Sequence, residues 1–324
     1  MERVLDVQNL SVGYKVYEGT LDVIPGLSLH VDAGQRVGLI GETGCGKTTV
    51  LKAATAVLRI PPAIMKAGAI QVCGVDIKSR GGVHNVRKNV SMIFQDPSSS
   101  LNPTLKISTQ MMDILKSQFP GLKKADYRRK MMDALKNVSM PAPERVLDSY
   151  PIQLSGGMRQ RICIAMALMK DTRLIIADEP TTALDVTIEE QILELLDQLV
   201  QKQKKSLIIV SHALGAIRKI TDFVYVMYAG NIVEYGPTTE VFADPRHPYT
   251  TGLLAATPKL TGDGIADGIA GDIPSYINPP AGCRFADRCP RASERCRAAA
   301  PTLKELPGTQ RMVSCFAAEE AKSI

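Results

Sequence analysis

No hydrophobic run in this sequence is long enough to cross a membrane, which takes about 18 to 20 consecutive apolar residues. The longest runs, at 174–177 and 207–210, have the length of buried strands. A signal peptide is also missing, because the N-terminus MERVLDVQNL has acidic residues where a basic region and an apolar core would stand. We therefore expect a protein that neither spans a membrane nor is exported, and that works in the cytoplasm.

Strong positive charge is missing as well. The formal net charge of +6 is modest for 324 residues, and the basic residues form only short clusters such as 123–130. A nucleic-acid-binding chain would concentrate them on one element, so we expect no nucleic acid partner. With 45% hydrophobic and 22% charged residues, the composition is that of a globular protein whose length suits one large domain and an appendage.

Short apolar runs bounded by Gly or Asp predict buried strands, and they lie at 37–41, 69–74, 90–95, 174–180, 207–212 and 223–230. Helical patterns lie between several of these runs. The clearest covers 187–203, where one face carries Ile188, Ile192, Leu195, Leu196 and Leu199. This alternation predicts an α/β fold with a parallel sheet that is covered by helices on both faces.

Two segments depart from the alternation. Residues of about 97–169 have helical patterns interrupted by prolines, which indicates a helical subdomain inserted in the α/β core. After residue 236 the chain becomes rich in Pro and Gly, and 262–272 resembles a linker or ordered loop. We therefore expect a core domain over 1–236 and a C-terminal extension over 237–324.

An eight-residue phosphate-loop pattern stands between the predicted strand 37–41 and a predicted helix. It consists of Gly41, Glu42, Thr43, Gly44, Cys45, Gly46, Lys47 and Thr48, and Thr49 follows it. Glycines allow backbone N–H groups to surround phosphates at a helix N-terminus. We expect Lys47 to reach the β- and γ-phosphates of ATP, and Thr48 to bind Mg²⁺. A thiol at Cys45 beside Lys47 should have a lowered pKa and react readily with maleimides.

Two adjacent acids end the predicted strand 174–180. An acid at the C-terminal end of such a strand can hold Mg²⁺, and a second acid beside it can take a proton from an attacking water molecule. We assign Asp178 to the metal and Glu179 to general-base catalysis.

The segment LSGGMRQR at 154–161 resembles the signature of ABC transporter ATPases. The resemblance implies that Ser155, Gly156 and Gly157 meet the γ-phosphate of ATP bound to a second ATPase subunit, in a head-to-tail dimer. It also implies a P-loop ABC ATPase fold with a mixed sheet and a helical subdomain.

Further residues take their expected roles from the same resemblance. Gln95 resembles the glutamine that senses Mg²⁺ and the γ-phosphate, and His212 resembles the switch histidine that contacts the γ-phosphate and orients water. Residues 183–185 resemble the loop whose aspartate, here Asp185, contacts the opposite subunit. Tyr14 resembles the aromatic residue that stacks on adenine, with Tyr17 as a rival.

One position departs from the family pattern. An aspartate often follows the switch histidine, whereas this sequence has Ala213. Alanine has no carboxylate, so we expect any contact that the aspartate would make to be missing here.

The segment VFADPRHPYT at 241–250 resembles the His-Pro-Tyr region of the oligopeptide, dipeptide and nickel importer subfamily. This implies a complex at the cytoplasmic face of the membrane that has two ATPases, usually nonidentical, two membrane permeases and an extracytoplasmic solute-binding protein. Peptides are the expected solute, with nickel or another small solute as the alternative. A soluble, non-transport ABC ATPase is a further alternative, although such proteins commonly carry two cassettes or a long coiled-coil insertion.

Four of the seven cysteines crowd near the C-terminus, at Cys283, Cys289, Cys296 and Cys315. Four thiolates can hold one zinc ion or the corners of an iron–sulfur cube. Paired Cys-x2-Cys knuckles, typical of structural zinc, are missing, and the subfamily resemblance implies a 4Fe-4S cluster. Zinc and free thiols remain alternatives. We expect this metal centre to structure the extension without taking part in ATP hydrolysis.

Overall fold

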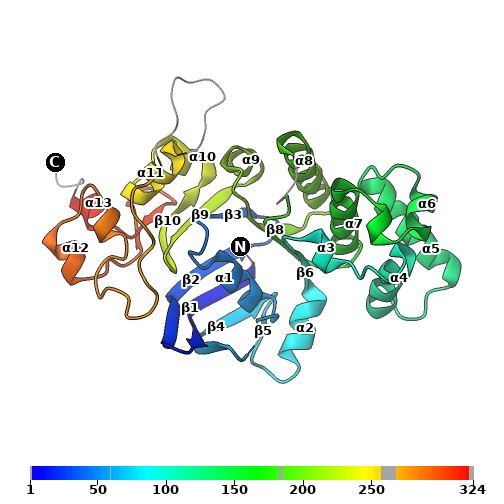
Figure 1. Ribbon diagram of the computed structural model, residues 1–324, viewed down its shortest axis with the longest axis horizontal. Coiled ribbons are helices and arrows are strands. Elements are labelled where there is room, and N and C mark those ends of the chain that lie inside the picture. The colour runs from blue at the N-terminus through cyan, green and yellow to red at the C-terminus, as the bar shows by residue number, and fades with distance from the viewer. Residues whose placement is uncertain (1, 59, 182–184, 257–267, 321–324) are drawn as a thin grey trace.

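The computed structural model describes residues 2–58, 60–181, 185–256 and 268–320. Its centre is an eight-stranded sheet in the order β11-β12-β10-β9-β3-β8-β7-β6 (Figure 1). The strands are β3 (Arg36–Ile40), β6 (Val90–Ile93), β7 (Leu174–Asp178), β8 (Ser206–Val210), β9 (Phe223–Tyr228), β10 (Asn231–Pro237), β11 (Lys304–Glu305) and β12 (Met312–Val313). The run from β9 to β6 is parallel, and β10 to β11 continue it antiparallel. The mixed α/β fold is confirmed.

A separate antiparallel sheet corrects one expectation. It has the order β2-β1-β4-β5, formed by β1 (Arg3–Val16), β2 (Gly19–Asp32), β4 (Ala63–Val72) and β5 (Val75–Asp76). The predicted strand 69–74 belongs here, at the end of β4, and not to the parallel sheet. A short apolar run predicts a buried strand, but the direction of its partner is set by tertiary pairing, here with β1.

The parallel strands are buried on both faces and separate two hydrophobic cores. All positions of β7 and β8 are buried, as expected for covered parallel strands. Because side chains alternate along a strand, Ile175 and Ala177 point into one core, whereas Leu174 and Ile176 point into the other.

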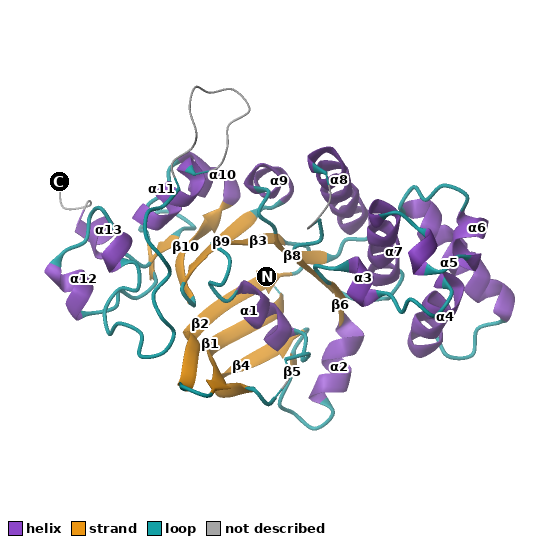
Figure 2. Ribbon diagram, viewed as in Figure 1, coloured by secondary structure: helices purple, strands orange, loops and turns teal. Residues whose placement is uncertain are grey.

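Helices cover each face of the sheet (Figure 2). On the first face lie α8 (Val186–Lys202), α9 (Leu214–Ile220), α10 (Thr238–Ala243) and α11 (Pro248–Ala255). On the second, α1 (Lys47–Ala54) lies between the central and antiparallel sheets, with α2 (Gly82–Asn89) beside β6. None of the helices that the structure describes combines the length and hydrophobicity needed to cross a membrane.

A group of helices stands at one end of the molecule, next to β6 and α8 (Figure 1). It comprises α3 (Pro97–Ser100), α4 (Ile107–Gln118), α5 (Lys124–Asn137), α6 (Pro143–Asp148) and α7 (Gly156–Leu168). These helices fall within the segment 97–169 whose pattern is helical. The buried α7 joins them to the core.

The C-terminal extension continues the central sheet. Strand β12 pairs with β10, and α12 (Glu294–Ala298) and α13 (Phe316–Glu320) lie beyond that edge. Arg311 of the extension donates to the buried Glu234 carboxylate of β10 at 2.7 Å, and their side chains are only 5% and 1% exposed. The expected boundary at residue 236 therefore falls inside β10, a strand that both parts share.

We expect Arg311→Met to lower the melting temperature of the full-length protein by several degrees, because it removes one partner of a buried ion pair. Such a loss costs about 3 kcal/mol. Backbone N–H groups of Arg246 and His247 still donate to Glu234 and keep the cost at the lower end. Differential scanning calorimetry measures the change, and an unchanged melting temperature would contradict this account of the contact.

Candidate functional site

The phosphate-loop residues form a tight turn between β3 and α1. Gly41, Gly44 and Gly46 have φ angles of +152°, +85° and +107°, in the region that favours glycine. A Cβ atom on Gly41 would lie 2.1 Å from the carbonyl oxygen of Met227, so no other residue fits there without a shift of the backbone. The turn delivers the chain to the N-terminus of α1, whose first turn has no acidic residue. An anion is therefore stabilised at this point.

Lys47 is held over this turn. Its Nζ atom donates to the carbonyl oxygens of Gly41 at 2.7 Å and Glu42 at 3.0 Å, and the residue is 5% exposed. The next residue, Thr48, donates from Oγ1 to Asp178 Oδ1 at 3.1 Å. Burial raises the pKa of Asp178, and the hydrogen bond from Thr48 partly opposes this effect. A cation bound beside Asp178 and Thr48 would stabilise the charged carboxylate.

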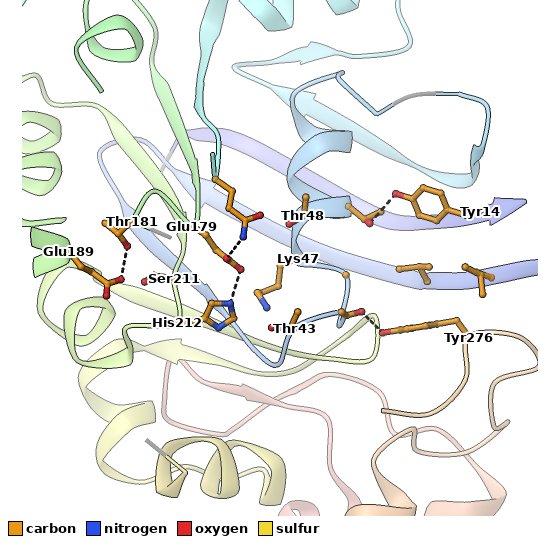
Figure 3. A pocket seen from close by; sticks show the side chains of 16 residues that line it. Tyr14, Thr43, Lys47, Thr48, Glu179, Thr181, Glu189, Ser211, His212 and Tyr276 are labelled. Atoms are coloured by element: carbon orange, nitrogen blue, oxygen red, sulfur yellow. Dashed lines mark hydrogen bonds and ion pairs between the residues drawn. The ribbon is translucent and has the colours of Figure 1, made fainter. Parts of the chain in front are cut away.

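Three predicted residues meet at the C-terminal ends of β6, β7 and β8. Glu179 Oε2 accepts a hydrogen bond from Gln95 Nε2 at 2.7 Å, and Glu179 Oε1 lies 2.8 Å from His212 Nε2 (Figure 3). Glu179 has a positive φ of +48°, which is strained for a residue with a side chain. With this backbone conformation, the Glu179 carboxylate lies beside His212 in the cavity (Figure 3).

A cavity of about 800 Å³ opens in front of these groups. Most of the predicted side chains line it: Tyr14, Thr43, Gly44, Gly46, Lys47, Thr48, Thr49, Gln95, Glu179 and His212. Sequence reasoning missed further lining residues: Leu21, Val23, Thr181, Glu189, Ser211 and Tyr276. The predicted residues that do not line it are Gly41, Glu42, Cys45, Asp178, Ser155, Gly156, Gly157 and Asp185.

The signature residues lie apart from this cavity. Ser155 is the N-cap of α7, where its Oγ atom accepts a hydrogen bond from the Met158 N–H at 3.3 Å. Asp185 is the exposed N-cap of α8, and the remaining residues of its loop, 183 and 184, lie outside the described residues. Ala213 is the N-cap residue of α9, and its N–H donates to Ser211 Oγ at 3.0 Å.

The two candidate aromatic residues are placed differently. The Tyr14 hydroxyl lies 3.1 Å from Thr49 Oγ1, at the end of the cavity opposite to Glu179 and His212 (Figure 3). Tyr17 is fully exposed and does not line the cavity. Tyr276 of the extension lies at the same end as Tyr14.

Comparison with known proteins agrees with this arrangement. The profile of the ABC transporter family matches residues 24–182, and that of the oligopeptide/dipeptide transporter C-terminal region matches residues 233–296. The chain is 43% identical to the oligopeptide transport ATP-binding protein OppD of Bacillus subtilis (strain 168), over 88% of this chain and 81% of the relative. It is 41% identical to the dipeptide transport ATP-binding protein DppD of the same organism, over 91% and 89%. The chain belongs to the family of ABC transporter ATP-binding proteins.

Solved structures of ABC ATPases share the fold. The structure of cbiO1 from Clostridium perfringens, part of the ABC transporter complex cbiONQ, covers 75% of this chain and 92% of its own, with a TM-score of 0.64 and 26% identity. A dimeric ATP-binding cassette in a post-hydrolysis state, bound to ADP and Pi, has the same TM-score at 23% identity over 72% of this chain and 98% of its own.

Within this ABC ATPase, the four C-terminal cysteines surround one small cavity of about 10 Å³, which His247 also lines. Burial raises the pKa of the Cys283 thiol to about 11, and it also raises those of Cys289 and Cys315. Across the ranges that the structure describes, no group of three or more His, Cys, Asp or Glu side chains is arranged to hold a metal ion.

Three residues of the extension reach the phosphate loop of this ATPase, and sequence reasoning missed their contacts. Tyr249 Oη accepts a hydrogen bond from the Glu42 N–H at 2.8 Å, and Tyr276 Oη donates to the Gly44 carbonyl at 2.9 Å. Arg288 donates to both carboxylate oxygens of Glu42, at 2.7 and 2.9 Å. Only the His-Pro-Tyr segment could have indicated one of these contacts from the sequence. His247 caps α11 through Nδ1, which places Tyr249 in the core.

The expected reactivity of Cys45 is wrong. The thiol is completely buried, and burial raises its pKa, although the positive charge of Lys47 opposes the shift. Burial in apolar surroundings raises a thiol pKa, and at Cys45 this effect outweighs the lowering expected beside a lysine at a helix N-terminus. Here the side chain turns inward beneath the loop.

We therefore expect Cys45 to resist maleimide at neutral pH in the folded protein and to react once the chain is unfolded in guanidinium. Peptide mapping by mass spectrometry measures labelling at each cysteine, and the half-buried Cys73 serves as an internal comparison. Rapid modification of Cys45 in the folded chain would contradict this placement of its side chain.

Proposed function

We propose that this protein is the ATP-binding and hydrolysing subunit of an ABC importer that takes up dipeptides or oligopeptides. One observation carries the choice of solute: the match to the oligopeptide/dipeptide transporter C-terminal region follows the ABC core in the same chain. The core motifs alone are compatible with transport in either direction.

The loop geometry supports ATP as the ligand. Backbone N–H groups at the start of α1, together with Lys47, bind the phosphates. The base then extends toward Tyr14, because the γ-phosphate end of the cavity is fixed by Glu179 and His212. Thr48 and Asp178, which already share a hydrogen bond, would hold Mg²⁺ with Gln95. When bound, this ion neutralises charge on the β- and γ-phosphates.

Hydrolysis requires a base beside the γ-phosphate. Glu179 is placed for this role, because its carboxylate lines the cavity between Gln95, which donates a hydrogen bond to Oε2, and His212, whose Nε2 lies 2.8 Å from Oε1. In the proposed mechanism Glu179 takes a proton from the attacking water molecule, while His212 stabilises the γ-phosphate oxygens.

A second ATPase subunit is part of the proposal. Ser155, Gly156, Gly157 and Asp185 do not line the cavity of their own chain, so they are available to the cavity of a partner. We propose a head-to-tail dimer, in this subfamily a heterodimer, that binds two membrane permeases at the cytoplasmic face and works with an extracytoplasmic solute-binding protein. Within each chain, we propose two units, the 1–236 core and the 237–324 extension.

We propose a 4Fe-4S cluster for the four cysteines that line this cavity, because their spacing lacks the paired Cys-x2-Cys knuckles typical of structural zinc. A zinc ion needs all four sulfurs about 2.3 Å from one point. A four-iron cube binds each thiolate at a separate corner, so the sulfurs stay further apart. The donor set of Cys283, Cys289, Cys296 and Cys315 fits this group, although a cavity of about 10 Å³ requires the thiols to rearrange around it. The cluster would cross-link the extension.

We expect Glu179→Gln to bind ATP but to hydrolyse it at least about a hundredfold more slowly, because the base is lost while the phosphate-binding groups remain. In proteoliposomes that contain the permeases, the partner ATPase and the binding protein, the wild-type subunit should drive ATP-dependent accumulation of a radiolabelled dipeptide or oligopeptide. The variant should not.

Glu190→Gln is the matched control, since Glu190 lies on the exposed surface of α8 and outside the cavity. It should keep wild-type turnover and uptake. Wild-type turnover in Glu179→Gln would exclude it as the base. If ATP hydrolysis does not depend on peptide, and nickel or another small solute accumulates instead, the proposed substrate class is wrong.

For the extension, we expect protein purified without oxygen to contain about four irons and four sulfides per chain, one for each corner of the cube. Replacement of Cys289 and Cys296 by Ser should remove them. Iron and sulfide analysis and the visible absorption spectrum measure the cluster content of the wild-type protein and of the variant. One zinc per chain would favour the alternative, and a folded, metal-free protein with four alkylatable thiols would exclude both centres.

A further inference from the structure

The extension touches the nucleotide site itself, which the expectation of a separate structural module did not include. The Arg288 guanidinium and the Glu42 carboxylate form a two-point ion pair, in which the arginine side chain is only 6% exposed. The Tyr276 hydroxyl donates to the carbonyl of Gly44 at 2.9 Å. Both acceptors are phosphate-loop residues.

Arg288 is itself fixed in place. Its guanidinium also donates to the carbonyl oxygens of Ile269 and Ala270, each at 2.9 Å. It lies 3.3 Å from the Tyr228 hydroxyl. A planar guanidinium held at so many points can orient a carboxylate, because the two parallel hydrogen bonds fix both distance and angle. The orientation of Glu42 thus depends on the extension.

Tyr276 has a second feature, because it lines the cavity. Tyr14 and Tyr276 lie at one end of the cavity, and Glu179 and His212 lie at the other (Figure 3). An ATP molecule whose phosphates lie on the loop, with the γ-phosphate toward Glu179, would place its base between or beside the two tyrosines. Tyr276 is held in place by two contacts: the Arg284 guanidinium lies 5.8 Å from the ring centre, and the Asp22 N–H donates to the Tyr276 backbone carbonyl at 2.8 Å.

We propose that the C-terminal extension completes the ATP site: Tyr276 binds the nucleotide base together with Tyr14, and Arg288 positions the phosphate loop through Glu42. The proposal rests on the proposed function as an ATPase subunit. Arg288 directly precedes Cys289, in the turn that begins at Cys283, so the segment that carries two of the four cysteines also carries the positioning residue.

The first test separates base binding from loop binding. The full-length chain and its Tyr276→Ala and Tyr276→Phe variants are titrated with Mg-ATP and with Mg-tripolyphosphate, which has no base. We expect Tyr276→Ala to weaken ATP binding about tenfold, a typical value for the loss of one aromatic stacking partner. Tyr276→Phe, which keeps the ring, should bind ATP more tightly than Tyr276→Ala. The two variants should bind Mg-tripolyphosphate with nearly equal affinity.

The second test addresses Arg288 with a double-mutant cycle. Arg288→Met and Glu42→Gln should each weaken Mg-ATP and Mg-tripolyphosphate about tenfold, since each removes a hydrogen-bonded charge pair. The double variant should bind no more weakly than either single variant, because both act through the same contact. Arg288→Lys, which keeps the charge but not the two-point geometry, should lie between wild type and Arg288→Met.

Arg311→Met is the matched control. It removes another buried arginine that joins the extension to the core, but one that does not contact the phosphate loop. It should lower the melting temperature and leave the affinity for Mg-ATP at the wild-type value. Should Arg288→Met fail to fold, Arg288→Lys and Tyr276→Phe carry the test, with melting curves recorded for every variant.

Wild-type affinities in Tyr276→Ala and Arg288→Met would overturn the proposal. So would a loss of ATP affinity in Arg311→Met equal to that in Arg288→Met, because affinity would then follow stability alone. If the wild-type chain hydrolyses ATP and the variants bind ATP as tightly as it does, only this inference fails. A wild-type chain that does not bind ATP defeats the proposed function.

Discussion

Parallel pairing of β3, β8, β7 and β6 is the constraint on which the rest of this structure depends. It places the C-terminal ends of all four strands at one sheet edge, where the phosphate loop, Glu179, His212 and Gln95 follow their strands. No single strand carries the chemistry. Each strand delivers one or two polar groups, and the hydrogen-bonded ladder fixes their spacing before any ligand binds.

Polar groups at this edge are tolerated because they have hydrogen-bond partners, although the strands behind them are buried between two apolar cores. The chain holds a buried lysine, a buried aspartate and a glutamate with a positive φ angle at the sheet edge. Lys47 is satisfied by loop carbonyls, and Asp178 is satisfied by Thr48. Burial is the main cause of the raised pKa of Asp178, and the neighbouring charge of Glu179 adds to it.

The extension contacts the phosphate loop, but its own hydrophobic clusters are much smaller than the two cores beside the central sheet. It joins the sheet through β12, is fixed by the Arg311–Glu234 ion pair, and then reaches back to the loop through Tyr249, Tyr276 and Arg288. A segment poor in aliphatic residues is thereby held to the core by ion pairs, hydrogen bonds and aromatic contacts. These contacts also explain physically what the His-Pro-Tyr segment does in this chain: it starts a helix and directs a hydroxyl to the loop.

The sequence by itself determined the phosphate loop, the paired acids and most of the strands, because each is a local pattern whose residue types impose a strand, a turn or a helix start. It also determined the family, since these motifs occur in a characteristic order. Tertiary structure alone decided which strands pair in parallel, which way Cys45 turns, and that the extension meets the loop. Tyr276 and Gly44 are separated by 232 positions, and Arg288 and Glu42 by 246. Contacts across such distances leave no local periodicity, because only the assembled sheet brings the two segments together.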